Sequence, residues 1–277
     1  TPRSPADLMA RLRIEQGRSL LAVGRRDDAR SALEAALALL QGPGERSQVA
    51  ELRAFHASAR REALELLVGL RVDRGDDGAA TLAEARRWLV AGALSADAVP
   101  ALPAPRPGAP WLVFLVGEER SFAWVVAADG TVVHRLPGRA ELHRLVAPVV
   151  ADLARPDRPV DAAALERLAA VLLAPLQGRW AENGVLRVAP DGLLHGIPWS
   201  ALPVAGRPAL EHGPLAEVAA FWTAAAGTGE LGGRSDGGGR AATAAGSAVQ
   251  RPAAPSALTV LAVGRDDAGE AGRKAAA

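Results

Sequence analysis

A proline-rich segment from Val99 to Pro110, VPALPAPRPGAP, divides the chain into two parts with different hydrophobic patterns. Proline lacks the backbone N–H that a helix needs and clashes with the preceding turn, so this segment cannot continue a helix. Before it, apolar residues recur at helical spacing, and after it short β-rich runs begin. We therefore predict a helical region over 1–98, a linker over 99–110 and an α/β region over 111–277.

The first part predicts helices separated by breaks that contain glycine. Residues 7–40 predict two helices broken at Gly24, and longer helical patterns follow over 45–73 and 80–94. The second helix carries one apolar stripe at helical spacing, formed by Ala29, Leu33, Ala36, Leu37 and Leu40.

The second part alternates strand and helix patterns. Three β-rich runs separated by GEER and AADG predict a three-stranded antiparallel meander over 111–136. Two amphipathic helices follow, the first with Leu142, Leu145, Val146, Val149, Val150 and Leu153 on one face and the second with Leu165, Leu168, Leu172 and Leu176. A strand over 185–189 is expected beside another over 258–263. Residues 226–255 have low complexity and are expected to be disordered.

The composition excludes several classes of function. The 32 basic and 31 acidic residues nearly cancel and the arginines are spread out, so no nucleic-acid partner is expected. The absence of cysteine excludes a disulfide framework, a thiolate metal site and a cysteine nucleophile within this chain. No apolar run approaches the roughly 20 residues that span a bilayer, and no leader follows Thr1. We expect a cytoplasmic protein without membrane contact, and a fragment of a longer chain because Thr1 is not a methionine.

The stretch RVAPDGLLHGIPWSALP, residues 187–203, combines the side chains of a catalytic site. A serine hydrolase needs a nucleophile on a strained elbow, but no G-x-S-x-G surrounds Ser200. We instead predict a tight turn at Gly192, a hydrogen-bonded structural role for His195, and packing by Leu193, Leu194, Ile197, Trp199 and Leu202. The other histidines are scattered without metal-ligand spacing: His56, His134, His143 and His212. The sequence therefore predicts no catalytic, cofactor-binding or metal-binding residue.

The first helical pair, residues 9–42, resembles a tetratricopeptide repeat. The residues at that family's spacings are Gly17, Leu20, Gly24, Ala29, Leu33 and Ala36. In such a repeat small residues let two helix axes approach, while Leu20 and Leu33 fill the seam. The alternative is an ordinary helical hairpin.

A second resemblance covers about residues 105–264 and is to the CHAT domain, a caspase-like domain often found behind tetratricopeptide repeats. Its GE-[DE]-R turn, W-V-V strand and D-G turn are matched by Gly117–Arg120, Trp124–Val126 and Asp129–Gly130. Leu172, Leu173, Pro175 and Leu176 supply its LL-x-P-L helix. Its later motif P-D-G-x-L-H-x-[IL]-P-[FW]-x-A-L is matched over Pro190–Leu202. The resemblance implies tetratricopeptide-like helical hairpins followed by an incomplete caspase-like α/β domain with an antiparallel hairpin extension.

The CHAT resemblance also implies cysteine-peptidase chemistry, which this chain lacks the residues to perform. The family's H-x-x-x-H-G and S-A-C motifs are absent, since no histidine follows His212 and there is no cysteine. The expected function is therefore binding of a protein or peptide by the helical repeat, with the meander 111–136 as a second docking edge. Two alternatives stay open: a scaffold with a degenerate CHAT domain, and a hydrolase that uses His195.

Overall fold

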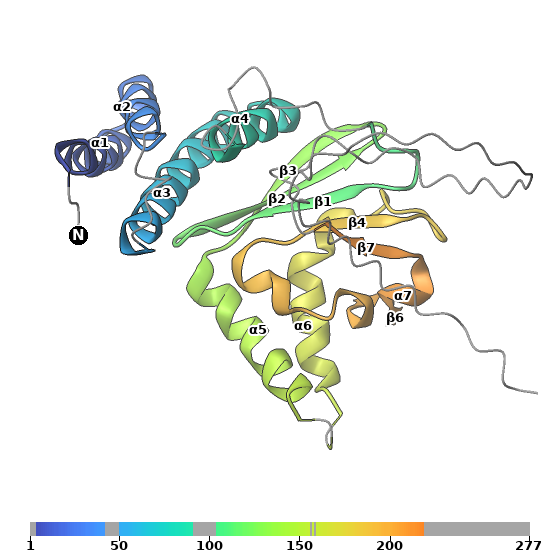
Figure 1. Cartoon of the computed structure of the whole chain (residues 1–277). Helices are drawn as coiled ribbons and strands as arrows, with labels where there is room; N and C mark the ends of the chain where they lie inside the picture. The colour runs from blue at the N-terminus through green and yellow to red at the C-terminus, as the bar shows by residue number, and fades with distance from the viewer. Residues whose placement is uncertain (1–3, 42–49, 91–103, 156, 158, 219–277) are drawn as a thin grey trace, which may run out of the picture. The chain divides into compact units, whose positions relative to one another are not determined.

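The computed structural model of the chain describes residues 4–41, 50–90, 104–155, 157 and 159–218 (Figure 1). Four helices precede a mixed β-sheet, which is followed by further helices, so the fold belongs to the α+β class. All of these described residues belong to one compact unit. The low-complexity segment 226–255 and the predicted strand 258–263 lie outside the described residues.

The helical part follows the predicted order. Helices α1 (Pro5–Ala22) and α2 (Arg26–Leu39) are separated at Gly24, whose φ of 79° confirms the predicted break. Ser4 and Asp7 form a capping box that fixes the start of α1. Helices α3 (Ala50–Arg74) and α4 (Gly78–Val90) flank the predicted RGDDG interruption.

Helices α1 and α2 cross closely at Gly17. A Cβ atom on this residue would lie 2.8 Å from the side chain of Leu33, which is fully buried. Gly17 and Leu33 therefore form the seam as predicted. Leu20 and Leu21 are both partly buried, and it is Leu21 that packs against the helical core, in place of the predicted Leu20.

We expect Gly17→Ala to destabilise the chain by about 1 kcal/mol, because the forced overlap with Leu33 outweighs the gain in helix propensity. Urea unfolding of Gly17→Ala, Leu33→Ala and the double variant measures the two effects separately. The overlap predicts that Gly17→Ala becomes stabilising once Leu33 is alanine. Equal effects of Gly17→Ala in both backgrounds would contradict a steric contact.

The sheet contains five strands in the order β3-β2-β1-β4-β7. Strands β1 (Trp111–Leu115), β2 (Arg120–Ala127) and β3 (Gly130–Pro137) form the predicted antiparallel meander. Strand β4 (Leu186–Ala189) is parallel to both β1 and β7 (Leu215–Glu217). The prediction that 185–189 lies beside 258–263 is therefore wrong for this sheet, because both edges of β4 are already paired. Strand β7, which has only three residues, was not predicted from the sequence.

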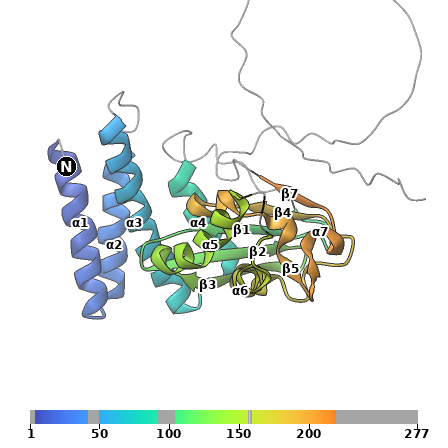
Figure 2. The ribbon, with the colours of Figure 1, turned by 90° about the horizontal axis from the view of Figure 1, so that it is seen from below.

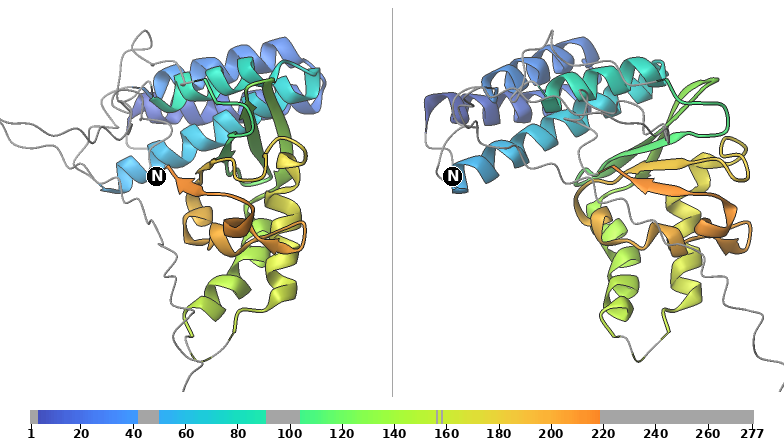
Figure 3. Two further views of the ribbon diagram at one scale, coloured as in Figure 1. Left: turned by 90° about the vertical axis from the view of Figure 1, so that its right-hand side faces the viewer. Right: turned by 45° about the vertical axis from the view of Figure 1, so that its right-hand side comes forward.

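The two faces of the sheet are covered by different helices, α3 and α4 on one side and α5 (Arg139–Leu153) and α6 (Ala162–Leu172) on the other (Figures 1 and 3). Alternate side chains of β2 supply both cores. Phe122 and Trp124 pack on the side of α3 and α4, and Ala123 and Val125 pack on the side of α5 and α6. The parts on either side of the proline-rich segment thus share a core.

A buried hydrogen bond also joins helix α4 to the sheet. The indole Nε1 of Trp124 donates to Thr81 Oγ1 on α4 at 3.0 Å. This bond satisfies a polar group in the middle of a hydrophobic layer, where an unpaired donor is costly.

Helices α5 and α6 follow the predicted periodicity with one difference. Leu142, Val146 and Val149 are buried, whereas Val150 and Leu153 are 39% and 46% exposed. The last turn of α5 extends beyond the sheet (Figure 1). The sheet therefore does not cover the apolar residues at that end of the helix.

After β4 the chain runs through short elements that close the α5/α6 layer. These are η3 (Ala174–Leu176) before the strand and η4 (Gly192–Gly196), η5 (Trp199–Ala201), β5 (Pro203–Val204), β6 (Arg207–Pro208) and α7 (Ala209–His212) after it.

Candidate functional site

Three charged residues on neighbouring turns of α3 each bind a different part of the molecule. Glu62 faces α1, Glu65 faces the turn between β1 and β2, and Arg61 faces the segment after β4. The helical part and the sheet meet at this junction.

Glu65 holds the turn between β1 and β2. Its carboxylate accepts hydrogen bonds from the backbone N–H groups of Glu118, Glu119 and Arg120, at 2.7, 2.9 and 2.7 Å. Glu65 is 4% exposed. Its buried carboxylate therefore accepts the hydrogen bonds of turn N–H groups that would otherwise need partners within the turn or in solvent. The GEER sequence was correctly predicted as a turn, but its dependence on a helix residue about 50 positions earlier was not visible.

Glu62 binds two arginines of α1. Arg18 contacts it at 2.6 Å and Arg11 contacts its other carboxylate oxygen. Glu15 also contacts Arg11 and Arg18, at 3.0 and 3.2 Å. Partial burial alone would lower the pKa of Arg18, but Glu62 and Glu15 outweigh it and raise that pKa. The four groups therefore form a charge-balanced bridge from α1 to α3.

Arg61 binds Asp191 in a two-point ion pair, with 3.0 Å between Nη2 and Oδ1. Asp191 also accepts the backbone N–H of Val116 at 2.7 Å, and Arg61 donates to the Val116 carbonyl at 3.0 Å. The sequence predicted this aspartate only as part of a turn. Its partner comes from the helical part 130 residues away, so no local pattern could identify it.

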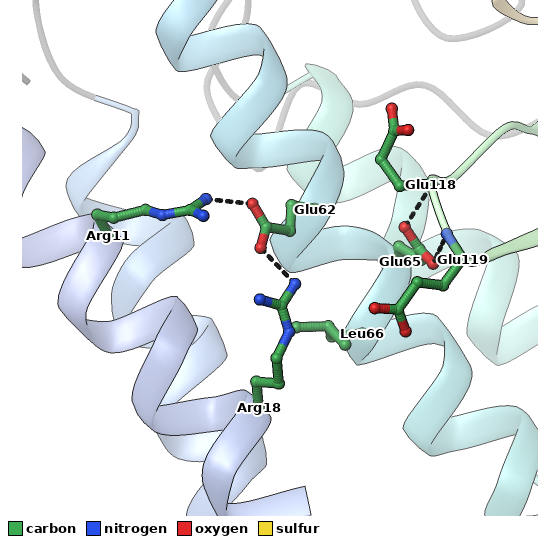
Figure 4. A pocket seen from close by; sticks show the side chains of 7 residues that line it. All are labelled: Arg11, Arg18, Glu62, Glu65, Leu66, Glu118 and Glu119. Atoms are coloured by element: carbon green, nitrogen blue, oxygen red, sulfur yellow. Dashed lines mark hydrogen bonds and ion pairs between the residues drawn. The ribbon is translucent and has the colours of Figure 1, made fainter. Parts of the chain in front are cut away.

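A hollow of about 180 Å³ lies between α1, α3 and the β1–β2 turn (Figure 4). Its lining residues are Arg11, Arg18, Glu62, Glu65, Leu66, Glu118 and Glu119. Four carboxylates face two guanidinium groups, so the lining carries a net negative charge. Glu62 and Glu65 are engaged internally, and Glu118 contacts Arg139 at 2.5 Å. The exposed carboxylates of Glu118 and Glu119 are the groups best placed to meet a ligand.

The stretch 187–203 is mainly a packing segment. Gly192 has a φ of 56°, which confirms the predicted turn, and Leu194, Ile197, Trp199 and Leu202 are buried. Leu193 is partly buried.

His195 has a hydrogen-bond partner, as predicted, but it lies at the surface. Its side chain is 48% exposed, and its Nδ1 lies 3.4 Å from Glu217 Oε1, a long contact at the surface. Within this described stretch His195 makes no hydrogen bond to Ser200, whose residue is exposed. The side chain lies at the surface because η4 turns it outward, while the neighbouring Leu194 is buried.

The remaining histidines occupy separate places. His56 on α3 lies 2.9 Å from Asp7 on α1, and both side chains are 5% exposed. His212 Nε2 lies 3.2 Å from the Trp180 carbonyl, and His143 is exposed on α5. Burial first, and then the charge of Arg179, lower the pKa of His134 on β3. Protonation of His134 at acidic pH therefore opposes folding.

Neither a metal site nor a membrane span is found in the part of the chain that the structure describes. No three His, Asp or Glu side chains there lie together as metal ligands would. No helix there is both long and apolar enough to cross a bilayer. No protein-family model matches the chain, and neither the curated proteins nor the solved structures give a match. The class of the protein therefore rests on its own residues: an α+β chain with a charged hollow between helices and sheet.

Proposed function

We propose that this chain is the N-terminal, non-catalytic part of a CHAT-domain protein and that it binds a protein or peptide partner through its tetratricopeptide-like helices. The observation that carries the proposal is the charged hollow. It opens between α1, the first helix of the repeat-like pair, and the GEER turn that carries the CHAT resemblance. Two segments identified independently in the sequence thus line one concave surface.

The rest of the geometry supports the proposal. The Gly17–Leu33 crossing is the close approach that a tetratricopeptide repeat requires. The segments that resemble the CHAT domain form consecutive parts of one sheet and its covering helices. In this proposal the edge strand β3 is a second docking surface, as an edge strand presents unpaired backbone groups.

The charge of the hollow favours a partner with a basic segment. Glu118 and Glu119 are exposed at its rim, and the net charge of the lining side chains is negative. Electrostatic complementarity of this kind chiefly sets specificity and association rate.

We expect the chain to bind peptides rich in arginine and lysine, and the double variant Glu118→Lys/Glu119→Lys to weaken that binding about tenfold or more. The control is Glu141→Lys/Glu166→Lys, which makes the same charge change on α5 and α6. Fluorescence anisotropy with a labelled basic peptide at two salt concentrations measures the difference. Equal binding by both double variants would remove the hollow from the proposal.

The same peptides should remain uncleaved, because peptide hydrolysis by the family's chemistry needs a thiolate and a nearby base. Mass spectrometry after prolonged incubation reads this directly. Cleavage that persists through purification and disappears in His195→Ala would favour the hydrolase alternative. If the basic peptides are neither bound in the anisotropy assay nor cleaved in the mass-spectrometry assay, the scaffold alternative is favoured instead.

A further inference from the structure

Helix α1 carries a row of exposed apolar residues on the side away from α2 and α3. Leu8, Met9 and Leu12 on the helix are 52%, 46% and 54% exposed, and Val23, the residue that caps its C-terminal end, is 70% exposed. Within the described residues they are four of the seven large hydrophobic side chains that are exposed. Their concentration on one element distinguishes them from the scattered apolar residues normal on a surface.

These residues belong to one continuous stripe along the helix. An α-helix turns through about 100° per residue, which places the exposed residues Leu8, Met9, Leu12, Gln16, Ser19 and Val23 within a sector of about 100°. We call this set the α1 outer stripe. The buried residues Ala10, Ile14 and Gly17 lie on the opposite side, toward α2 and α3. In Figure 2, α1 is the outermost of these three helices.

The shape of the stripe specifies a helix as its occupant. Met9, Leu12, Gln16, Ser19 and Val23 follow alternating steps of three and four, the spacing that a second helix covers when packed lengthwise. An extended peptide matches a two-residue repeat and would contact this row poorly.

The charges beside the stripe indicate the partner's polar flanks. Arg13 borders it on one side, and its guanidinium contacts the Gln16 amide oxygen at 2.8 Å. Glu15 borders the other side, but its charge is offset by Arg11 and Arg18. The border therefore has a net positive charge and favours carboxylates across from it. A second copy of α1 would instead bring the same positive border against itself.

We propose that the α1 outer stripe docks an amphipathic helix of a partner protein whose apolar face is flanked by aspartate or glutamate. This surface is separate from the charged hollow and does not depend on the proposed function. The apolar residues of the α1 outer stripe supply the area that is buried on binding, and the positive charge of Arg13 selects the acidic flank of the partner helix.

The test uses two synthetic helical peptides of about 20 residues. Both carry leucine at the spacing of the stripe, one with glutamate flanks and the other with lysine flanks. In anisotropy titrations the full chain should bind the acidic peptide at least tenfold more tightly than the basic one. Arg13→Glu should remove or reverse that preference, and Leu12→Glu should weaken binding of the acidic peptide at least tenfold. The matched control is Leu210→Glu, which alters a similarly exposed leucine on α7.

Three results would overturn this proposal. The first is equal binding of the acidic peptide by the unaltered chain and by Leu12→Glu, with circular dichroism showing both folded. The second is equal binding of the acidic and basic peptides. The third is a dimer in light scattering that Leu12→Glu dissociates, which would make a second copy the occupant. Because Glu118→Lys/Glu119→Lys leaves α1 unchanged, it should still bind the acidic peptide, which separates this test from that of the hollow.

Discussion

Replacing Glu65 with alanine should lower the free energy of unfolding by about 2–4 kcal/mol. The substitution removes three charge-assisted hydrogen bonds to the β1–β2 turn at once. The turn also loses its attachment to α3, so the helical layer and the sheet become less tightly joined. Urea unfolding of the full chain, followed by circular dichroism and tryptophan fluorescence, measures the change.

Two further variants test the cause of that loss. Glu65→Gln keeps an acceptor oxygen but removes the charge, so it should fall between the original chain and Glu65→Ala. Glu34→Ala removes a partly exposed carboxylate that pairs with Arg30 within α2 and should change stability by less than about 0.5 kcal/mol. An effect of Glu65→Ala no larger than that of Glu34→Ala would contradict an anchoring role.

The sequence predicted the elements better than it predicted how they meet. Gly24 and the GEER turn mark their positions by local chemistry, and the meander follows from period-two runs, so each could be placed without a structure. Strand β7 was missed because three residues carry too little pattern to distinguish a strand from a loop.

The candidate site was less predictable, because it depends on contacts between distant residues. Glu65 and Arg61 look like ordinary charges on the polar face of a helix, and their turn and aspartate partners come from beyond the proline-rich segment. For His195 the sequence predicted a hydrogen bond but not the exposure of the side chain at the surface. Motif composition located the segment but could not give side-chain orientation within a 3-10 helix.

The pair Arg61–Asp191 should show an asymmetric response to mutation. Asp191 is 8% exposed, so Arg61→Ala leaves a buried carboxylate without its cation and should cost about 3 kcal/mol. Asp191→Asn keeps an oxygen for the Val116 N–H, and Arg61, whose side chain is 29% exposed, can be hydrated. Its cost should be closer to about 1 kcal/mol.

The double variant then distinguishes an ion pair from simple packing. Once residue 191 is a neutral asparagine, removing Arg61 no longer leaves a buried charge, so Arg61→Ala/Asp191→Asn should be more stable than the sum of the single effects by about 1–2 kcal/mol. Arg179→Ala, which breaks an exposed pair with Asp129, serves as the surface control and should cost less than about 0.5 kcal/mol. Strict additivity in the cycle would mean that Arg61 contributes through its aliphatic contacts alone. Coupling of the expected size would establish that α3 holds the segment after β4 by charge, just as Glu65 holds the turn after β1.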